Sequence, residues 1–215
     1  MPRRAIRLTL AMALVGAAAC EDAAAPTRQA TYPFDLFQTG LVFRWTPDHL
    51  PIRYWVAGDA GIVEGFVQEG LRGWERQFLY GEFRGVVVTD STEADVLVRV
   101  TPAGPPAGTP NNNPPEIGAC DGVTGFDLSD TDALLGPFEV RVGWDARYAD
   151  SDVVNCLERV TIHEIGHTIG LFAHSSNELD LMYPNPRVRA PSADDRGTAE
   201  VLYHTAPNIS PPAGR

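Results

Sequence analysis

The chain shows two kinds of apolar periodicity, one typical of strands and one typical of helices. Alternating apolar and polar positions, as in residues 138–144 (FEVRVGW), predict strands with one buried face. A short valine run next to turn residues predicts a further strand. The predicted strands are residues 52–56, 86–88, 96–100, 123–128 and 138–144.

Helical spacing of apolar residues occurs in other segments. Residues 60–79 repeat apolar side chains every three or four positions, although their glycines weaken the prediction. An apolar-rich helix is expected from about Asp152 to Ile169, because N-capping residues precede it and Gly170 suits its C-terminal end. A last helix is expected from Ser192 to about Tyr203, because acidic residues occupy its first turn, where the helix dipole favours them.

Residues 1–19 have the pattern of a signal peptide. Arginines precede an apolar run, Leu8 to Ala19, that is too short to span a bilayer as a stable helix. The stretch Ala17-Ala18-Ala19-Cys20 resembles a bacterial lipobox, although leucine is usual where Ala17 stands. In that motif the cysteine is lipidated and becomes the new N-terminus. We therefore expect an exported lipoprotein of the bacterial cell envelope, held at the membrane through a lipid on Cys20, with free secretion as the alternative.

The rest of the chain is predicted to form one domain between two irregular ends. Residues 20–40 are predicted to be a tether, because they begin with small residues, polar residues and prolines. The folded domain is expected in residues 41–206, and residues 207–215 are predicted to be a disordered tail. Residues 101–118 (TPAGPPAGTPNNNPPEIG) are rich in proline and predict a surface loop, either a connector or a lid over a cleft.

The composition fits a soluble globular protein with a single core. The chain has 215 residues, of which 44% are hydrophobic and 21% are charged. Its net charge is −11, which becomes −14 if Arg3, Arg4 and Arg7 leave with the signal peptide. An acidic chain without a basic patch is a poor partner for nucleic acid, so we expect no nucleic-acid ligand. We also expect a monomer.

The strongest chemical signal is HEIGH, residues 163–167, within the second expected helix. Two histidines four positions apart lie one turn apart on one helix face, so both imidazoles can reach one ion, and zinc accepts such ligands. Glu164 points to the side, where it can take a proton from a water molecule activated by zinc. Three of the five histidines fall within residues 163–174, which makes a chance match to this H-E-x-x-H motif less credible.

The residues around this motif resemble the metzincin clan of zinc peptidases and, within it, the matrixins. The family pattern is H-E-x-x-H-x-x-G-x-x-H followed by a methionine turn. The matching residues are His163, Glu164, His167 and Gly170. The third histidine of the pattern would fall on Ala173, but here it comes one residue later, at His174. Met182 lies eight residues after His174 and is followed by Tyr183-Pro184, like the matrixin methionine turn. The resemblance therefore implies that His174 is the third zinc ligand, with Asp180 as the fallback ligand.

The resemblance also implies an α+β, metzincin-like fold: a twisted, mixed five-stranded sheet packed on helices, with the active-site helix followed by the methionine turn and a C-terminal helix. In the family, the counterpart of Met182 forms an apolar floor beneath the zinc ligands. Asp194 and Asp195 would tie the last helix to the methionine turn. Pro184 falls in the wall of the specificity pocket. Arg159 matches a position at the bottom of that pocket, although a solvated arginine is the alternative.

Two further expectations concern a cross-link and a second ion. If Cys20 is lipidated, Cys120 and Cys156 remain, and in an exported protein we expect them to form a disulfide between the active-site helix and the edge of the sheet. Calcium is a second candidate ion, as in many matrixins, although a solvated acidic loop is the alternative. Its candidate ligands, whose spacing matches no calcium-loop motif, are Asp127, Asp130 and Asp132.

These features together predict a zinc-dependent endopeptidase that acts on a protein or peptide substrate. The three histidines would hold zinc, and Glu164 would act first as a base and then as an acid. As the resemblance implies, an extended peptide would pair with a sheet edge near residues 122–128. The alternatives are a zinc-containing cell-surface binding module without turnover and a surface adhesin without metal.

Overall fold

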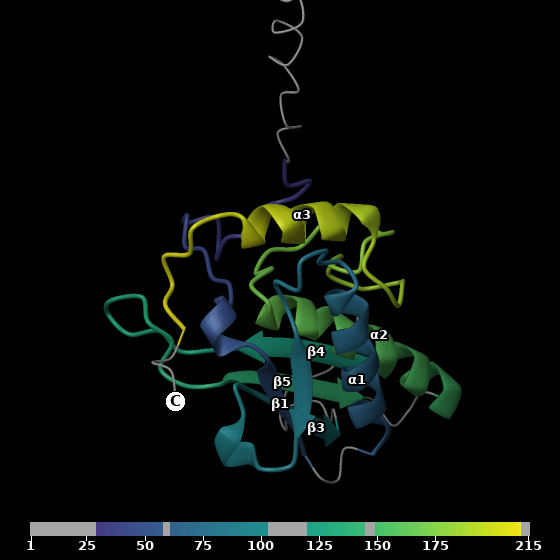
Figure 1. The fold of residues 1–215 in the computed structure, drawn as a ribbon. Coiled ribbons are helices and arrows are strands. Elements are labelled where there is room, and N and C mark those ends of the chain that lie inside the picture. Colours follow the sequence, from purple (N-terminus) through teal and green to yellow (C-terminus); the bar gives the residue numbers. More distant parts are fainter. Residues whose placement is uncertain (1–28, 58–60, 103–119, 145–148, 212–215) are drawn as a thin grey trace, which may run out of the picture.

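The computed structural model describes residues 29–57, 61–102, 120–144 and 149–211. A sheet forms its centre, helices α1 and α2 pack together against this sheet, and α3 lies across one end of the molecule (Figure 1). The predicted signal peptide, residues 1–19, and Cys20 lie outside the described residues, as does most of the predicted loop 101–118. In the described part of the chain, no helix is long and apolar enough to cross a membrane.

The sheet has five strands in the order β2-β1-β3-β5-β4. They are β1 (Ile52–Val56), β2 (Gly85–Val88), β3 (Val96–Pro102), β4 (Cys120–Gly125) and β5 (Phe138–Trp144). Four strands are parallel, whereas β4 is antiparallel to β5 and forms one edge. This mixed sheet with its helices confirms the predicted α+β, metzincin-like fold class. The start of the predicted loop is wrong, because residues 101 and 102 continue β3 and pair with β5.

The three α-helices lie close to where the periodicity placed them. They are α1 (Ile62–Glu75), α2 (Asp150–Thr168) and α3 (Ala193–Tyr203), and the 3₁₀-helices are η1 (Pro47–His49) and η2 (Ser91–Glu93). A capping box starts α3: Ser192 accepts hydrogen bonds from the first turn, and Asp195 accepts one from the Ser192 backbone. The end of the first predicted helix is wrong, since α1 stops at Glu75 and residues 76 and 77 form a turn.

Buried side chains of three different segments hold α2 in place. The Tyr54 hydroxyl on β1 lies 2.7 Å from the Thr168 hydroxyl, and both groups are buried. The indole of Trp74 on α1 donates to the Ile162 carbonyl at 3.0 Å, and that of Trp45 donates to the Thr168 carbonyl at 2.8 Å. Because buried polar groups are costly to leave unpaired, these bonds fix the position of α2 against the sheet.

The predicted tether, residues 20–40, is wrong in its C-terminal part. Tyr32 is only 6% exposed, and the backbone of Thr31 donates to the Thr198 hydroxyl on α3. The Phe34 carbonyl accepts a hydrogen bond from the Phe172 backbone. Small residues and prolines dominate the start of this segment, but the aromatic residues after position 31 bury apolar area and hold it on the domain.

The predicted disordered tail, residues 207–215, is also wrong where the structure describes it. Ile209 is 1% exposed, and the Asn208 side chain accepts a hydrogen bond from the Val42 backbone. The Ser210 backbone donates to the Asp132 carbonyl. One buried isoleucine and the satisfied backbone groups around it are enough to order residues that look like a polar tail.

Candidate metal centre and cleft

Helix α2 and the loop after it bring three histidines to one point. His163 and His167 lie one turn apart on α2, and His174 follows in the loop. Nitrogen atoms of the three imidazoles lie within 4.8 Å of one another, close enough to share one ion. Among the described residues they are the one such group of histidine, cysteine or acidic side chains.

A sharp reversal at Gly170 lets His174 reach this point. Its φ is +107°, a conformation that L side chains rarely adopt, and an added Cβ would lie 2.1 Å from the Phe43 carbonyl oxygen. The chain therefore leaves the helix at a position where only glycine fits. The extra residue before His174 lies in this loop rather than in the helix, so it does not displace His163 or His167.

Backbone carbonyls orient the two helical imidazoles. Nδ1 of His163 donates to the Leu181 carbonyl at 2.7 Å, and Nδ1 of His167 donates to the Leu171 carbonyl at 2.6 Å. A carbonyl can only accept, so each Nδ1 carries the proton and each Nε2 keeps its lone pair. Metal-binding histidines usually have this second hydrogen bond, which fixes both the tautomer and the ring plane.

Desolvation lowers the pKa of all three histidines, although the His174 side chain is partly open to solvent. Desolvation lowers the pKa of His167 and of His174 to about 4, and for His174 the nearby His167 adds to the effect. The pKa of His163 falls well below its ordinary value for the same reason, with a further contribution from His167. At neutral pH the three rings therefore present lone pairs rather than positive charges, which is the form that binds a metal.

Glu164 lies beside the first histidine, against the edge strand β4. It is 4% exposed, and the Thr124 hydroxyl donates to its Oε2 at 2.6 Å. Burial is the main cause that raises the Glu164 pKa to about 7, and the nearby Asp121 adds to it, whereas the Thr124 hydrogen bond opposes it. Gly122 allows this packing, because an added Cβ there would lie 2.6 Å from Glu164 Oε1. The carboxylate is therefore held between α2 and β4.

The segment around Met182 lies beneath the histidines. Met182 is fully buried, and an added Cβ at Gly166 on α2 would lie 2.4 Å from its sulfur. The buried Asp195 carboxylate accepts hydrogen bonds from the Leu181 and Met182 backbones at 2.7 and 3.3 Å. A charged acceptor at the start of α3 thus fixes this turn in place.

The carboxylate of Asp180, the fallback zinc ligand, does not join the three histidines. Its carboxylate accepts hydrogen bonds from Ser175, Asn177 and Ser192. These three donors satisfy both of its oxygens, and it is not part of the histidine group. The described geometry therefore places His174, and not Asp180, beside the helical histidines.

The family model of the matrixins matches residues 122–204, which include the histidines, Glu164 and Met182. The chain contains a matrixin-like metzincin domain. This confirms the resemblance expected from the motif and the methionine turn. A search of curated proteins found no match to the chain. At the level of the family, the match supports a zinc metalloprotease with a catalytic zinc and protein or peptide substrates.

The residues of the matrixin-like domain fit a zinc ion. Three neutral imidazoles converge, two of them with Nε2 left free by carbonyl hydrogen bonds. Three protein ligands, with a further position open, are the usual set of a catalytic rather than a structural zinc site. The donor set of this chain therefore agrees with the metal that the family implies.

A cleft of about 530 Å³ opens over the histidines. One wall is β4 with Phe126, and Phe172 and Pro184 also line the cleft. Leu36 and Phe37 of the N-terminal segment also line the cleft, and their sequence pattern did not predict this. The apolar pair Leu36-Phe37 in a supposed tether was the only signal that could have indicated their position. Pro184 thus lies in the cleft, and its place in the wall of a specificity pocket stays a prediction.

Arg159, expected at the bottom of the specificity pocket, does not line the cleft. Its Nε donates to the Asn155 carbonyl one turn earlier on α2, as a solvated helix arginine does. This geometry favours the alternative interpretation of Arg159. Of the paired aspartates, Asp195 makes the predicted bonds to the methionine turn, whereas Asp194 contributes its backbone carbonyl to Thr31.

The matrixin-like domain has the expected disulfide between Cys120 on β4 and Cys156 on α2. The cross-link joins the edge strand to the helix that carries His163. Calcium gains no support, because the aspartates proposed for it do not form a metal-binding group in the described chain. These candidates were Asp127, Asp130 and Asp132.

Proposed function

We propose that the chain is a zinc-dependent endopeptidase. The observation that carries the proposal is the convergence of three neutral imidazoles within 4.8 Å, beside the buried Glu164 carboxylate. Zinc, when bound, supplies Lewis-acid chemistry: it lowers the pKa of a water molecule to about 7 and polarises a carbonyl oxygen. A purely structural zinc site has no need of a carboxylate at this position.

Each remaining step falls to a residue of the chain. Glu164 takes the proton from the attacking water and later passes it to the nitrogen of the leaving amine. The Thr124 hydroxyl holds Oε2 of this carboxylate, so that the group keeps one orientation during both transfers. Among the described residues, β4 pairs with no strand on its outer edge, so this edge offers backbone donors and acceptors to an extended peptide, which would lie in the cleft as an added strand.

The test measures zinc per chain and the hydrolysis of denatured casein. We expect the wild-type protein to bind one zinc and to cut casein. The Glu164→Ala variant should keep zinc but lose hydrolysis, and the His174→Ala variant should lose both zinc and hydrolysis. The control is His204→Ala, which removes the exposed histidine that follows the last residue of α3 and should change neither reading.

The outcomes separate this proposal from its alternative. Stoichiometric zinc without cleavage of any unfolded protein would indicate a binding module without turnover. Hydrolysis that survives Glu164→Ala would overturn the role of that carboxylate. Zinc and hydrolysis that both survive His174→Ala would show that another group completes the site.

We further propose that the protein is exported and held at a bacterial membrane through a lipid on Cys20, with free secretion as the alternative. The support is the signal-peptide pattern and the lipobox-like Ala17-Ala18-Ala19-Cys20. Metabolic labelling with a palmitate analogue should mark the wild-type protein but not Cys20→Ser. Label-free protein in the medium would favour free secretion. The monomeric state stays a prediction, which the mass from light scattering would check.

A further inference from the structure

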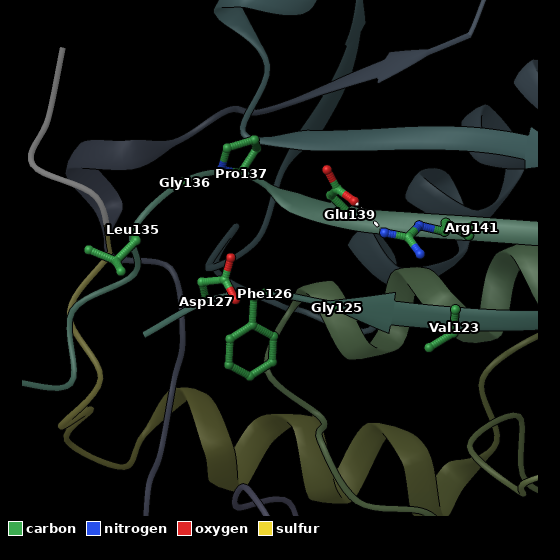
Figure 2. Close-up of a pocket in the computed structure, with 9 residues that line it drawn as sticks. All are labelled: Val123, Gly125, Phe126, Asp127, Leu135, Gly136, Pro137, Glu139 and Arg141. Carbon is green, nitrogen blue, oxygen red and sulfur yellow. Dashed lines mark hydrogen bonds and ion pairs between the residues drawn. The ribbon is translucent and has the colours of Figure 1, made fainter. Parts of the chain in front are cut away.

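A second cavity, of about 360 Å³, lies on the outer side of β4 and β5 (Figure 2). The register of the two strands explains its position. Val123 pairs with Arg141 and Gly125 pairs with Glu139, and these residues point away from the face that buries Phe138 and Val140. The lining residues are Val123, Gly125, Phe126, Asp127, Leu135, Gly136, Pro137, Glu139 and Arg141.

This outer cavity and the active-site cleft share part of β4. Val123, Gly125 and Phe126 line both. Gly125 leaves the strand open between them, because an added Cβ would meet no atom closer than the Glu139 carbonyl at 4.0 Å. A polypeptide that lies in the cleft and leaves it past Gly125 therefore enters the outer cavity at the same strand.

The outer cavity combines negative charge with apolar surface. Arg141 pairs with Glu139 at 2.9 Å, which leaves the Asp127 carboxylate without a hydrogen-bond or ion-pair partner among the described residues. Figure 2 shows Asp127 and Glu139 on either side of the same hollow. Val123 is 56% exposed and Leu135 is 66% exposed. A carboxylate next to exposed aliphatic groups suits a long basic side chain, whose stem packs on apolar surface while its head meets the charge.

We propose that the outer cavity is a distal substrate subsite that takes an arginine or lysine side chain of the polypeptide being cut. The inference rests on the proposed peptidase function and adds a preference in substrate class to it. The basic residue lies outside the segment that pairs with β4, on the part of the substrate that leaves the cleft past Gly125. The subsite therefore acts on the affinity for the substrate and not on the chemical step.

The experiment compares peptides that share one cleavable core, taken from a cleavage site mapped in casein. Each core is extended at its N-terminal or its C-terminal end by a short linker and then by arginine, citrulline or glutamate. Citrulline has the shape of arginine without its charge. We expect arginine at one of the two ends to lower KM about three- to fivefold relative to citrulline, with kcat unchanged, as for a largely solvated ion pair. The difference should shrink as salt is added.

Two variants test whether the Asp127 carboxylate causes the preference for arginine over citrulline. Asp127→Asn should remove the preference for arginine over citrulline, while the core peptide is cut at the wild-type rate. Asp130→Asn, which removes an exposed carboxylate outside the cavity, should leave the preference intact. Equal KM values for arginine and citrulline in the wild type, or a preference that survives Asp127→Asn, would overturn the subsite.

The design separates this inference from the proposed function. If zinc-loaded wild-type protein cuts no site in casein, the peptidase proposal fails, and the core is then a casein segment chosen without a mapped site. The same peptides are therefore also titrated into zinc-loaded Glu164→Ala and followed by fluorescence anisotropy. Tighter binding of the arginine peptide supports the subsite even without turnover, and equal binding of the arginine and citrulline peptides contradicts it.

Discussion

At the scale of single residues, small groups decide whether the catalytic constellation can form. The Thr124 hydroxyl orients Glu164, and the missing side chain of Gly122 lets β4 approach that carboxylate. The H-E-x-x-H spacing predicts Glu164 and the helical histidines, because four residues make about one helical turn. It does not predict Thr124, whose role depends on the approach of a strand 40 positions earlier in the chain.

We expect Thr124→Val to lower kcat about tenfold, the value of roughly one hydrogen bond to a charged group. Valine has nearly the same shape but no donor, so zinc content and KM should stay close to the wild type. Thr124→Ser keeps the hydroxyl and should recover most of the rate. Steady-state kinetics on a fluorescence-quenched peptide would measure kcat and KM of both variants. Equal kcat values for the valine and serine variants would contradict the role of the Thr124 hydroxyl in orienting Glu164.

Gly170→Ala tests the reversal that delivers His174. The positive φ and the clash with the Phe43 carbonyl should lower the free energy of unfolding by at least about 3 kcal/mol. The variant should also lose zinc, because the loop after the helix is displaced. Gly197→Ala on α3 is the control: its Cβ would meet nothing within 4 Å, so it should change stability by no more than about 1 kcal/mol. Urea unfolding and metal analysis measure both effects.

At the scale of elements, periodicity identifies the strands and helices better than it identifies the ends of the chain. Strand β5 alternates in register with the core, so it is predicted to its bounds. Helix α2 begins two residues before the predicted start, because Ala149 and not one of the expected capping residues precedes its first turn. Residues 29–40 and 207–211 have no regular apolar period that would predict their structure. They are held on the domain by single buried side chains such as Tyr32 and Ile209. The resemblance predicted a mixed five-stranded sheet, but the strand order and the antiparallel pairing of β4 came only from the structure, since pairing partners are not visible in one sequence.

The N-terminal segment gives a prediction about substrate binding. Phe37 lines the cleft but is 86% exposed, so Phe37→Ser should leave the melting temperature unchanged. It should raise KM for apolar peptides about two- to fivefold, because apolar contact area with the substrate is lost. Leu79→Ser, at a 74% exposed position outside the cleft, is the matched control and should affect neither quantity. An unchanged KM in Phe37→Ser would remove the segment from the substrate site.

At the scale of the whole molecule, the disulfide joins the two elements that form the walls of the catalytic site. Cys120 and Cys156 are 36 positions apart, so the cross-link restricts a long loop in the unfolded chain. Replacing both with serine should cost about 3–4 kcal/mol by the loop-entropy relation, or roughly 10 °C in melting temperature for a domain of this size. Calorimetry of the double variant, beside the wild type with and without reductant, checks this value. A wild type that melts at the same temperature when fully reduced would contradict it.

The Asp195 carboxylate also links residues that lie far apart along the chain. It accepts hydrogen bonds from the Tyr32 hydroxyl and from the Met182 backbone, so one side chain connects the start of the domain to the floor of the metal centre. Tyr32 leaves the ribosome among the first residues of the domain, whereas Asp195 follows 163 positions later. Contacts of such long separation form slowly, because the intervening loop must first be closed. The hydrogen bond between Tyr32 and Asp195 can therefore form only after α3 has been made. The turn beneath the histidines is held by Asp195 only when the two ends of the domain have come together.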